Sequence, residues 1–219
     1  MPTNELILIG LIVFGLFTLY AYIYALTICL IAAIVPVKVE RISLGFGETL
    51  ANFSILGRKI KIGLLPLGTS IKFVEGPQGL EGLSRPFRLL FRVVGEVIVL
   101  AAAIAYLPEL VLGLPEKVAS TAWGLIVEPF NTARSVAGQI VQVVRTEDPA
   151  ALIALACGLQ AIINLVPLPS VNGGAFLVEL FEWMTGSTLN YLKSGPLLVV
   201  SLLAILYCYG WMIAGFFLI

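Results

Sequence analysis

The stretch Asn164-Leu-Val-Pro-Leu-Pro-Ser-Val-Asn-Gly-Gly174 closes an apolar run and decides the fold. Its two prolines and two glycines interrupt the helix that residues 150–166 would otherwise continue. Backbone groups freed inside a bilayer must be bonded by protein or by water in a cavity. We therefore expect a broken helix with a buried site beside the break. A plain helix exit at the membrane surface is the alternative.

The rest of the chain is too apolar for a soluble domain. Of its 219 residues, 59% are hydrophobic and 12% are charged, whereas soluble domains average about 45–50% and about 25%. Thirteen basic residues balance thirteen acidic ones, so no net charge favours nucleic acid as a partner. The sequence has no histidine, which excludes sites that need an imidazole as metal ligand or general base. The three cysteines are isolated, and we expect neither a metal nor a cofactor.

Charge-free apolar runs of about 20 residues indicate membrane spans. We expect an α-helical, multi-pass membrane protein that forms a single domain over residues 1–219 in the lipid bilayer, with four transmembrane helices at 6–35, 87–107, 150–167 and 196–219. Nine of the thirteen Lys and Arg residues fall in or beside the loop between the first two spans. The positive-inside rule makes this loop cytoplasmic and puts both termini outside. The cytoplasmic (inner) membrane is the expected location.

The two long loops differ in pattern. Residues 37–74 alternate apolar and polar positions between glycines and prolines, which predicts a small antiparallel sheet, or β-loop. Because some of its segments are apolar on both faces, we expect this β-loop to contact the membrane surface. The outer loop, 108–149, holds apolar stretches too short to span, and we expect it to lie at the interface.

The block 164–174, followed by an aromatic and acidic helix and by Thr185-Gly186, resembles the third-span signature N-x-x-P-x-P-x-x-D-G-G of the site-2 proteases. That family consists of intramembrane zinc metalloproteases. The segments Val39–Gly47 and Leu65–Phe73 resemble the family's membrane-associated β-loop. The resemblance covers nearly the whole chain and implies the family fold, with a β-loop between the first two spans and a broken third helix.

The resemblance fails at the catalytic positions. Family members hold zinc with two His of H-E-x-x-H in the first span and one Asp before the G-G pair, and the Glu is the general base. The register of the β-loop aligns Tyr24 and Ile28 with the two His, Ala25 with the Glu, and Asn172 with the Asp. Ile28 has no lone pair, Ala25 cannot take a proton, and Asn172 lacks the carboxylate charge. Tyr24 could bind a metal only as a phenolate. We therefore expect the protease fold without its zinc.

Glu96 is an ionisable residue inside the second span, where the family usually has A-G-P and this chain has Val94-Gly95-Glu96. A charged residue inside a span indicates function by default. Arg92 lies one turn earlier on the same helix face, so a paired anchor of Arg92 and Glu96 near the interface is the alternative. Tyr20 and Tyr24 also share a face. They either line a polar cavity or pack with their hydroxyls bonded to neighbours.

The leading hypothesis is a catalytically inactive relative of the site-2 proteases, a pseudoprotease rather than an enzyme. It would bind or scaffold transmembrane segments or other membrane proteins, as a subunit of a membrane complex. The residues expected to contact the partner belong to the break and the β-loop: Asn164, Pro167, Pro169, Val171, Asn172, Gly173 and Gly174, with Leu65 and Gly68. Asn164 and Asn172 would bond an added strand or the broken backbone.

Two other functions stay open at this point. An enzyme with a rebuilt, non-zinc site would use Tyr24, Thr27, Glu96 and Asn172, the polar groups available in and near the spans. A subunit of a small-solute carrier or channel would suit the broken helix and the membrane Glu, although no inverted repeat is visible.

Overall fold

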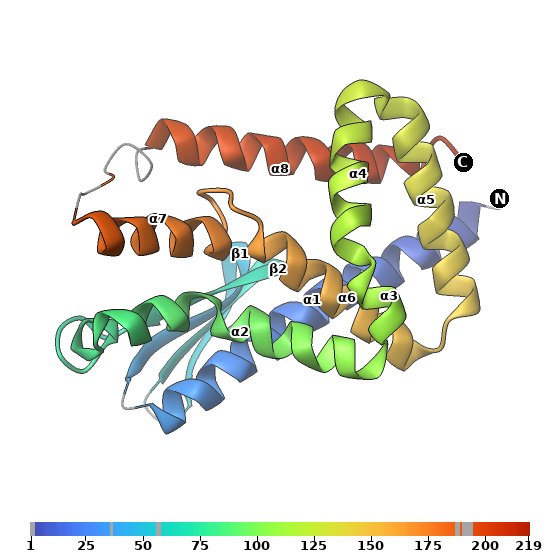
Figure 1. Ribbon diagram of the computed structural model, residues 1–219. Coiled ribbons are helices and arrows are strands. Elements are labelled where there is room, and N and C mark those ends of the chain that lie inside the picture. Colours follow the sequence, from blue (N-terminus) through green and yellow to red (C-terminus); the bar gives the residue numbers. More distant parts are fainter. Residues whose placement is uncertain (1–2, 36, 56–57, 187–188, 190–194) are drawn as a thin grey trace.

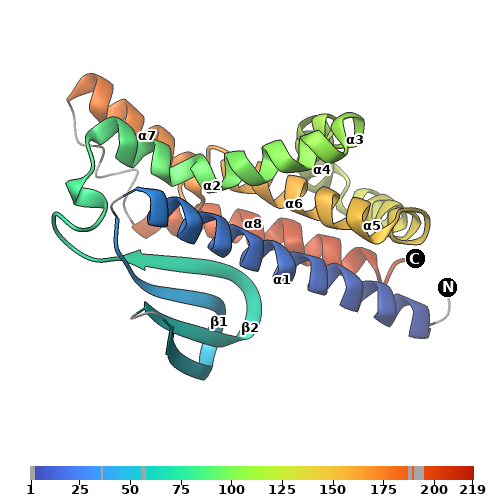
Figure 2. The same ribbon diagram turned by 90° about the horizontal axis from the view of Figure 1, so that it is seen from below.

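The computed structural model describes residues 3–35, 37–55, 58–186, 189 and 195–219. Helices dominate (Figure 1), and the sheet follows the first helix in the chain and lies on the side of that helix away from the second long one (Figure 2). The elements are α1 (Thr3–Ile34), β1 (Val39–Ile55), β2 (Arg58–Phe73), a 3-10 turn (Leu80–Gly82), α2 (Arg85–Tyr106), α3 (Pro108–Leu112), α4 (Leu114–Val127), α5 (Pro129–Thr146), α6 (Pro149–Leu165), α7 (Asn172–Thr185) and α8 (Gly195–Gly215).

Three of the described helices, α1, α2 and α8, are long and apolar enough to cross a membrane. Their bounds agree with three of the predicted spans to within a few residues. The helix at the remaining predicted span, α6, is apolar but only 17 residues long. It starts at a strong N-cap, because the Asp148 carboxylate accepts from the backbone N–H groups of Ala150 and Ala151. Because α6 is shorter than the other three apolar helices, the count of four spans stays a prediction.

The predicted sheet is present as two long, bent strands that pair with each other (Figure 2). Their bends bring four segments side by side. Residues 41–44 pair with 69–72 on one side and with 59–62 on the other, and residues 51–55 pair with 58–62. The two outer pairings are antiparallel. The segment 51–55 is therefore one edge of the sheet.

Helices α1, α2 and α6 pack together in the middle of the molecule, and α7 lies along α2 (Figures 1 and 2). The predicted outer loop, 108–149, forms helices α3, α4 and α5. The last two of these helices form a hairpin against α8 (Figure 1). At the crossing of α5 and α8, a Cβ on Gly215 would lie 2.3 Å from the carbonyl oxygen of Ala133. Glycine at that position lets the two backbones approach.

Candidate functional site

The helix break lies where the proline and glycine stretch predicts it. Helix α6 ends at Leu165 and α7 begins at Asn172. Between them the backbone turns tightly, with Leu168 N donating to Val166 O at 2.8 Å and Val171 N donating to Leu168 O at 3.0 Å. The chain thus satisfies part of its freed backbone within the break itself.

The glycine pair after the break is required by close backbone approach. A Cβ on Gly173 would lie 2.2 Å from the carbonyl oxygen of Leu165, and one on Gly174 would lie 2.1 Å from that of Leu168. Both glycines are buried in the first turn of α7. The loop therefore folds onto the start of this helix, and only residues without a Cβ leave room for it.

Two asparagine–tyrosine pairs attach the break to α1. Asn164, before the break, donates from Nδ2 to the Tyr20 hydroxyl at 2.9 Å. Asn172, after the break, donates from Nδ2 to the Tyr24 hydroxyl at 3.1 Å. The two rings are one helical turn apart and stack with their centroids 6.1 Å apart. Both tyrosine hydroxyls are thus bonded to neighbours, and both amides bond side chains of α1.

Glu96 joins the second pair and completes a polar cluster. Asn172 Nδ2 also donates to Glu96 Oε1 at 2.5 Å. The Glu96 side chain is fully buried, and its other oxygen, Oε2, has no hydrogen-bond partner within the described residues. Tyr24, Glu96 and Asn172, called the Glu96 cluster below, thereby connect α1, α2 and α7. Burying a carboxyl group is costly, so each hydrogen bond to it matters for the packing of these helices.

The arginines of α2 pair with a residue that the sequence analysis did not single out. Glu179 of α7 accepts from Arg88 Nε at 3.0 Å and from Arg92 Nε at 3.2 Å. The ion pair of Arg92 is therefore with Glu179 and not with Glu96, so the predicted paired anchor is wrong in its partner. The shared face was predicted correctly, because Glu96, Arg92 and Arg88 all face α7. Glu179 lies seven residues after Asn172 and hence on the same side of α7, which is the signal that could have revealed it.

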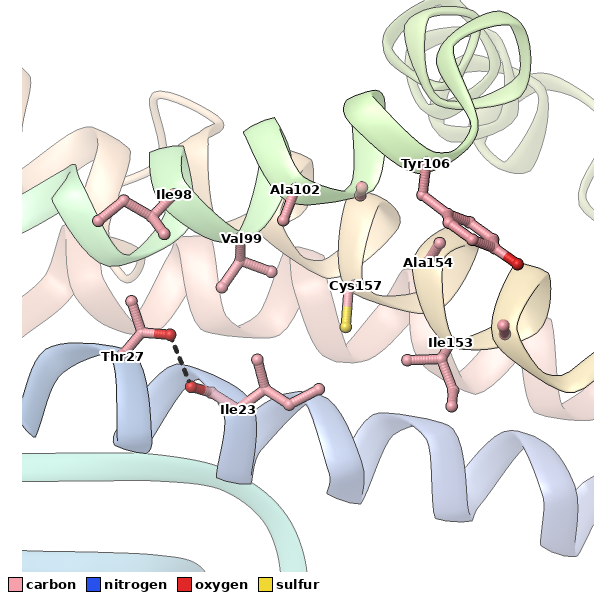
Figure 3. Close-up of a pocket in the computed structure, with 11 residues that line it drawn as sticks. Ile23, Thr27, Ile98, Val99, Ala102, Tyr106, Ile153, Ala154 and Cys157 are labelled. Carbon is pink, nitrogen blue, oxygen red and sulfur yellow. Dashed lines mark hydrogen bonds between the residues drawn. The ribbon is translucent and has the colours of Figure 1, made fainter. Parts of the chain in front are cut away.

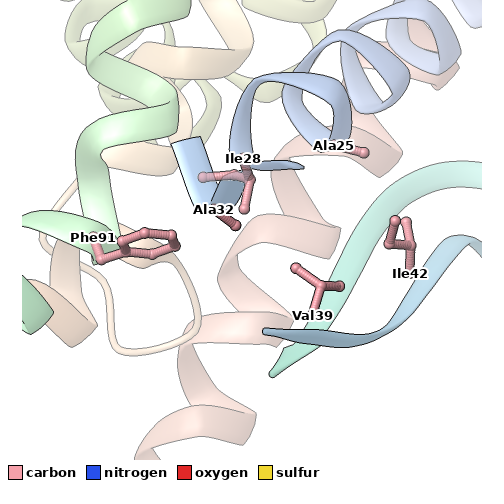
Figure 4. Packing of buried hydrophobic residues seen from close by; sticks show 6 residues of the cluster. All are labelled: Ala25, Ile28, Ala32, Val39, Ile42 and Phe91. Carbon is pink, nitrogen blue, oxygen red and sulfur yellow. The ribbon is translucent and has the colours of Figure 1, made fainter. Parts of the chain in front are cut away.

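The positions aligned with the zinc ligands do not fit zinc. Ala25 and Ile28 are 5% and 3% exposed and belong to an apolar cluster that joins α1 to the sheet and to α2 (Figure 4). A Cβ on Gly95 would lie 2.6 Å from Tyr24 Cε2 and 2.7 Å from Ile28 Cδ1, so α2 packs directly on these side chains. Among the described residues, no three Cys, Asp or Glu side chains gather as a metal would need. Zinc prefers four ligands from Cys, His and carboxylates, and the aligned ligand positions hold an isoleucine, an amide and a tyrosine hydroxyl that is bonded to that amide.

An apolar hollow of about 320 Å³ opens between α1, α2 and α6 (Figure 3). Thr27 borders it, but its hydroxyl donates to the carbonyl oxygen of Ile23 at 2.8 Å, within its own helix. The lining is therefore almost entirely hydrocarbon, and it suits apolar side chains or lipid tails. The residues around the hollow are Ile23, Thr27, Ile98, Val99, Ala102, Ala103, Tyr106, Ala150, Ile153, Ala154 and Cys157.

The structure brings some of the predicted partner-binding residues together. Pro167, Pro169 and Val171 lie in the break, next to the glycine pair. Leu65 and Gly68 belong to strand β2, and only their backbone is described. The two groups of residues therefore belong to different elements, the break after α6 and the strand β2.

A family model described as Peptidase family M50 matches residues 29–208. The chain belongs to peptidase family M50, the site-2 protease family. M50 proteins are embedded in membranes, in agreement with the three long apolar helices. A search of curated proteins found no match.

The M50 match covers the sheet, the Glu96 region and the broken helix, including Asn172. It begins at Cys29, one residue after the pentad 24–28. The alignment of Tyr24, Ala25 and Ile28 with the family's catalytic residues therefore rests on the spacing to the β-loop and stays a prediction.

Proposed function

We propose that this M50 protein is catalytically inactive and binds or scaffolds transmembrane partners, as a subunit of a membrane complex. The observation that carries the proposal is the Glu96 cluster. Two of the positions aligned with zinc ligands, Tyr24 and Asn172, belong to this cluster, and apolar Ile28 occupies the third. Apolar Ala25 stands at the position aligned with the general base. The broken helix and the sheet, which would bind a partner, are retained.

The same contacts argue against a rebuilt catalytic site. Glu96 is fully buried, so a substrate could not reach it without separating α2 from its neighbours. Thr27 donates its hydroxyl to the backbone of its own helix. Neither residue is arranged as a nucleophile with an adjacent base.

Two surfaces support the binding of a partner. Within the described residues, the edge segment 51–55 pairs with a neighbouring strand on one side only, so an extended segment can add on its other side as a further strand. The apolar hollow between α1, α2 and α6 can take the side chains of a helix that lies in the bilayer. An extended segment of the partner would fit the edge, and a transmembrane helix would fit the hollow.

The proposed orientation follows from the basic residues. With the sheet on the cytoplasmic side, both termini lie outside and the basic loop stays inside, as the positive-inside rule requires. Single cysteines at exposed Asn4 and exposed Lys59, in variants that lack the native cysteines, would report the orientation through labelling by a membrane-impermeant thiol reagent. The cysteine of Asn4→Cys should react in intact cells. The cysteine of Lys59→Cys should react only after the membrane is opened.

Photo-crosslinking in native membranes tests the binding role. A photoreactive residue at Val171 or at Leu65 should capture a membrane protein, and mass spectrometry should locate the crosslink in or beside its transmembrane segment. The same residue at Leu11, an exposed position of α1, is the matched control for contact with lipid and for random collision. Equal capture at all three positions, or none at Val171 and Leu65, would reject the binding role.

The absence of zinc proteolysis is tested separately. Purified protein should contain far less than one zinc per chain after exposure to excess zinc and removal of free metal. It should also leave a set of transmembrane substrates of M50 proteases intact. Stoichiometric zinc would overturn the alignment of Tyr24 and Ile28, and cleavage that disappears in Glu96→Gln would revive a rebuilt active site.

A further inference from the structure

The sheet has two chemically different faces. Residues that pair across neighbouring strands point to the same side, so the register identifies each face. Ile42 pairs with Ile71 and with Ile60, and Phe53 pairs with Ile60. Ile42 and Val39 pack against α1 (Figure 4). This apolar face therefore points toward α1, and the opposite face points away from it.

The opposite face is basic. Arg41 pairs with Lys72 on one side and with Lys59 on the other. Lys61 lies two residues after Lys59 and on the same side of its strand. Asn52, on the edge segment, pairs with Lys61 and so lies on this face as well. Four cations thus share one face of a small sheet.

One of the four cations is paired. Lys72 forms ion pairs with Glu40 at 3.0 Å and with Glu75 at 3.8 Å. Arg41, Lys59 and Lys61 form no ion pair with the part of the chain that the structure describes. The hydrogen bond from Lys72, together with the nearby charges of Lys72, Arg41 and Lys59, holds the pKa of Glu40 below its usual range.

The edge beside this face is open. Residues 51–55 pair with 58–62 on one side, and residues 52–55 are all exposed. Along this edge Asn52 and Ser54 point to the basic face, whereas Phe53 and Ile55 point to the apolar face. A strand added here would continue both faces, because its side chains alternate in the same way.

We propose that the edge 51–55 binds an extended segment of the membrane partner in which acidic residues alternate with apolar ones. The inference rests on the proposed binding role and specifies the chemistry of the partner. Acidic side chains of the added strand would lie about 10 Å, or two strand spacings, from the backbone of Lys59 and Lys61. Lys and Glu side chains together span that distance. The apolar residues of the strand would extend the row that contains Phe53 and Ile55.

A protein segment fits the basic face better than lipid headgroups do. The apolar face, with Phe53 and Ile55 41% and 50% exposed, is the one on the side of α1. A sheet that rests on the bilayer would turn this apolar face toward the lipid. The basic face would then point to the aqueous side, where an acidic strand and not a headgroup meets it.

Peptide binding to the full chain in nanodiscs of neutral phosphatidylcholine tests the inference. The probe is a fluorescent peptide of about ten residues that alternates Glu and Val, a length that matches one strand. The matched peptide has Lys in place of Glu. The Glu peptide should bind, and the Lys peptide should bind much more weakly. Lys59→Glu combined with Lys61→Glu should weaken binding of the Glu peptide about tenfold or more. Lys117→Glu, at an exposed position of α4, should leave binding unchanged.

If the double charge reversal fails to fold, Lys59→Gln combined with Lys61→Gln replaces it, with a smaller loss expected. Equal binding of the two peptides, or an affinity that both double variants leave unchanged, would overturn the inference. A Glu peptide that does not bind would also overturn it. In discs that contain both lipids, enrichment of phosphatidylserine around the wild-type protein and not around the variants would then show that the face binds lipid.

The outcomes separate this inference from the proposed function. Partner capture at Val171 without peptide binding would reject the acidic strand and leave the binding role intact. Peptide binding without any specific capture in membranes would support the edge as an acidic-strand site and reject the transmembrane partner.

Discussion

The side-chain amide of Asn172 is the position at which one substitution tests the Glu96 cluster. Its NH2 group donates to Glu96 Oε1 at 2.5 Å and to the Tyr24 hydroxyl at 3.1 Å. Asn172→Asp introduces the residue that the resemblance to the family predicts at this position, but it replaces this donor with a second carboxyl group against Glu96. Two carboxylates in contact cannot both be ionised, and a buried acceptor that loses its donor costs about 1–3 kcal/mol.

We expect Asn172→Asp to lower the free energy of unfolding by about 3 kcal/mol at neutral pH. For a chain of this size, each kcal/mol corresponds to about 2–4 °C in Tm, so the expected loss is about 6–12 °C. The loss should shrink as the pH falls, because protonation of one carboxyl lets it donate to the other in the folded state. The folded variant then binds more protons than the unfolded variant, so lowering the pH favours the folded state.

Thermal unfolding in detergent at neutral and mildly acidic pH measures both effects. Glu96→Gln combined with Asn172→Asp should recover most of the lost Tm, because the new amide can donate to the new carboxylate. Asn4→Asp, at an exposed position where α1 begins, is the matched control and should have little effect. The reasoning fails if Asn172→Asp melts like the wild type at neutral pH, or if the double variant is no more stable than Asn172→Asp alone.

Three further predictions concern the scaffold around the cluster. Gly174→Ala should destabilise the protein by about 2–4 kcal/mol, because the new Cβ would meet the backbone of the break. Gly10→Ala, with open space around it, should be neutral or mildly stabilising, and the difference in Tm between the two variants measures the effect. Glu179→Gln removes the charged partner of both α2 arginines and should lower the free energy of unfolding by about 1 kcal/mol, more at low salt than at high salt. Glu116→Gln, at an exposed position of α4, should leave Tm unchanged in the same thermal unfolding experiments. Gly95→Leu should force α2 away from α1 and reduce the amount of folded protein on size-exclusion chromatography, and a normal elution profile would contradict the tight packing at that position.

The agreement between sequence and structure is best where a local pattern decides. The period-2 alternation over 37–74 predicted the sheet, and β1 and β2 lie within it. The prolines and glycines of 164–174 predicted the interruption between α6 and α7. The predicted outer loop did not reveal the hairpin of α4 and α5, because its helices are held by packing on α8 as well as by their own apolar stretches.

The candidate site shows why contacts between distant segments escape a reading of the sequence. The spacing of four between Arg92 and Glu96 correctly put both on one helix face, but helix geometry alone cannot tell which neighbour that face meets. In the structure the face packs on α7. Arg92 consequently pairs with Glu179, and Glu96 receives a hydrogen bond from Asn172, which is 76 residues away in the chain.

Composition and the absence of histidine are properties of the sequence alone, and they predict a membrane protein without imidazole chemistry. The sequence also determined the broken helix, since proline and glycine act on the backbone where they stand. Only the tertiary structure decided that the carboxyl group of the site comes from α2 and the amide from α7, and that one face of the sheet collects the basic residues. Both depend on which elements lie side by side, and packing and strand register, not local propensity, control that arrangement.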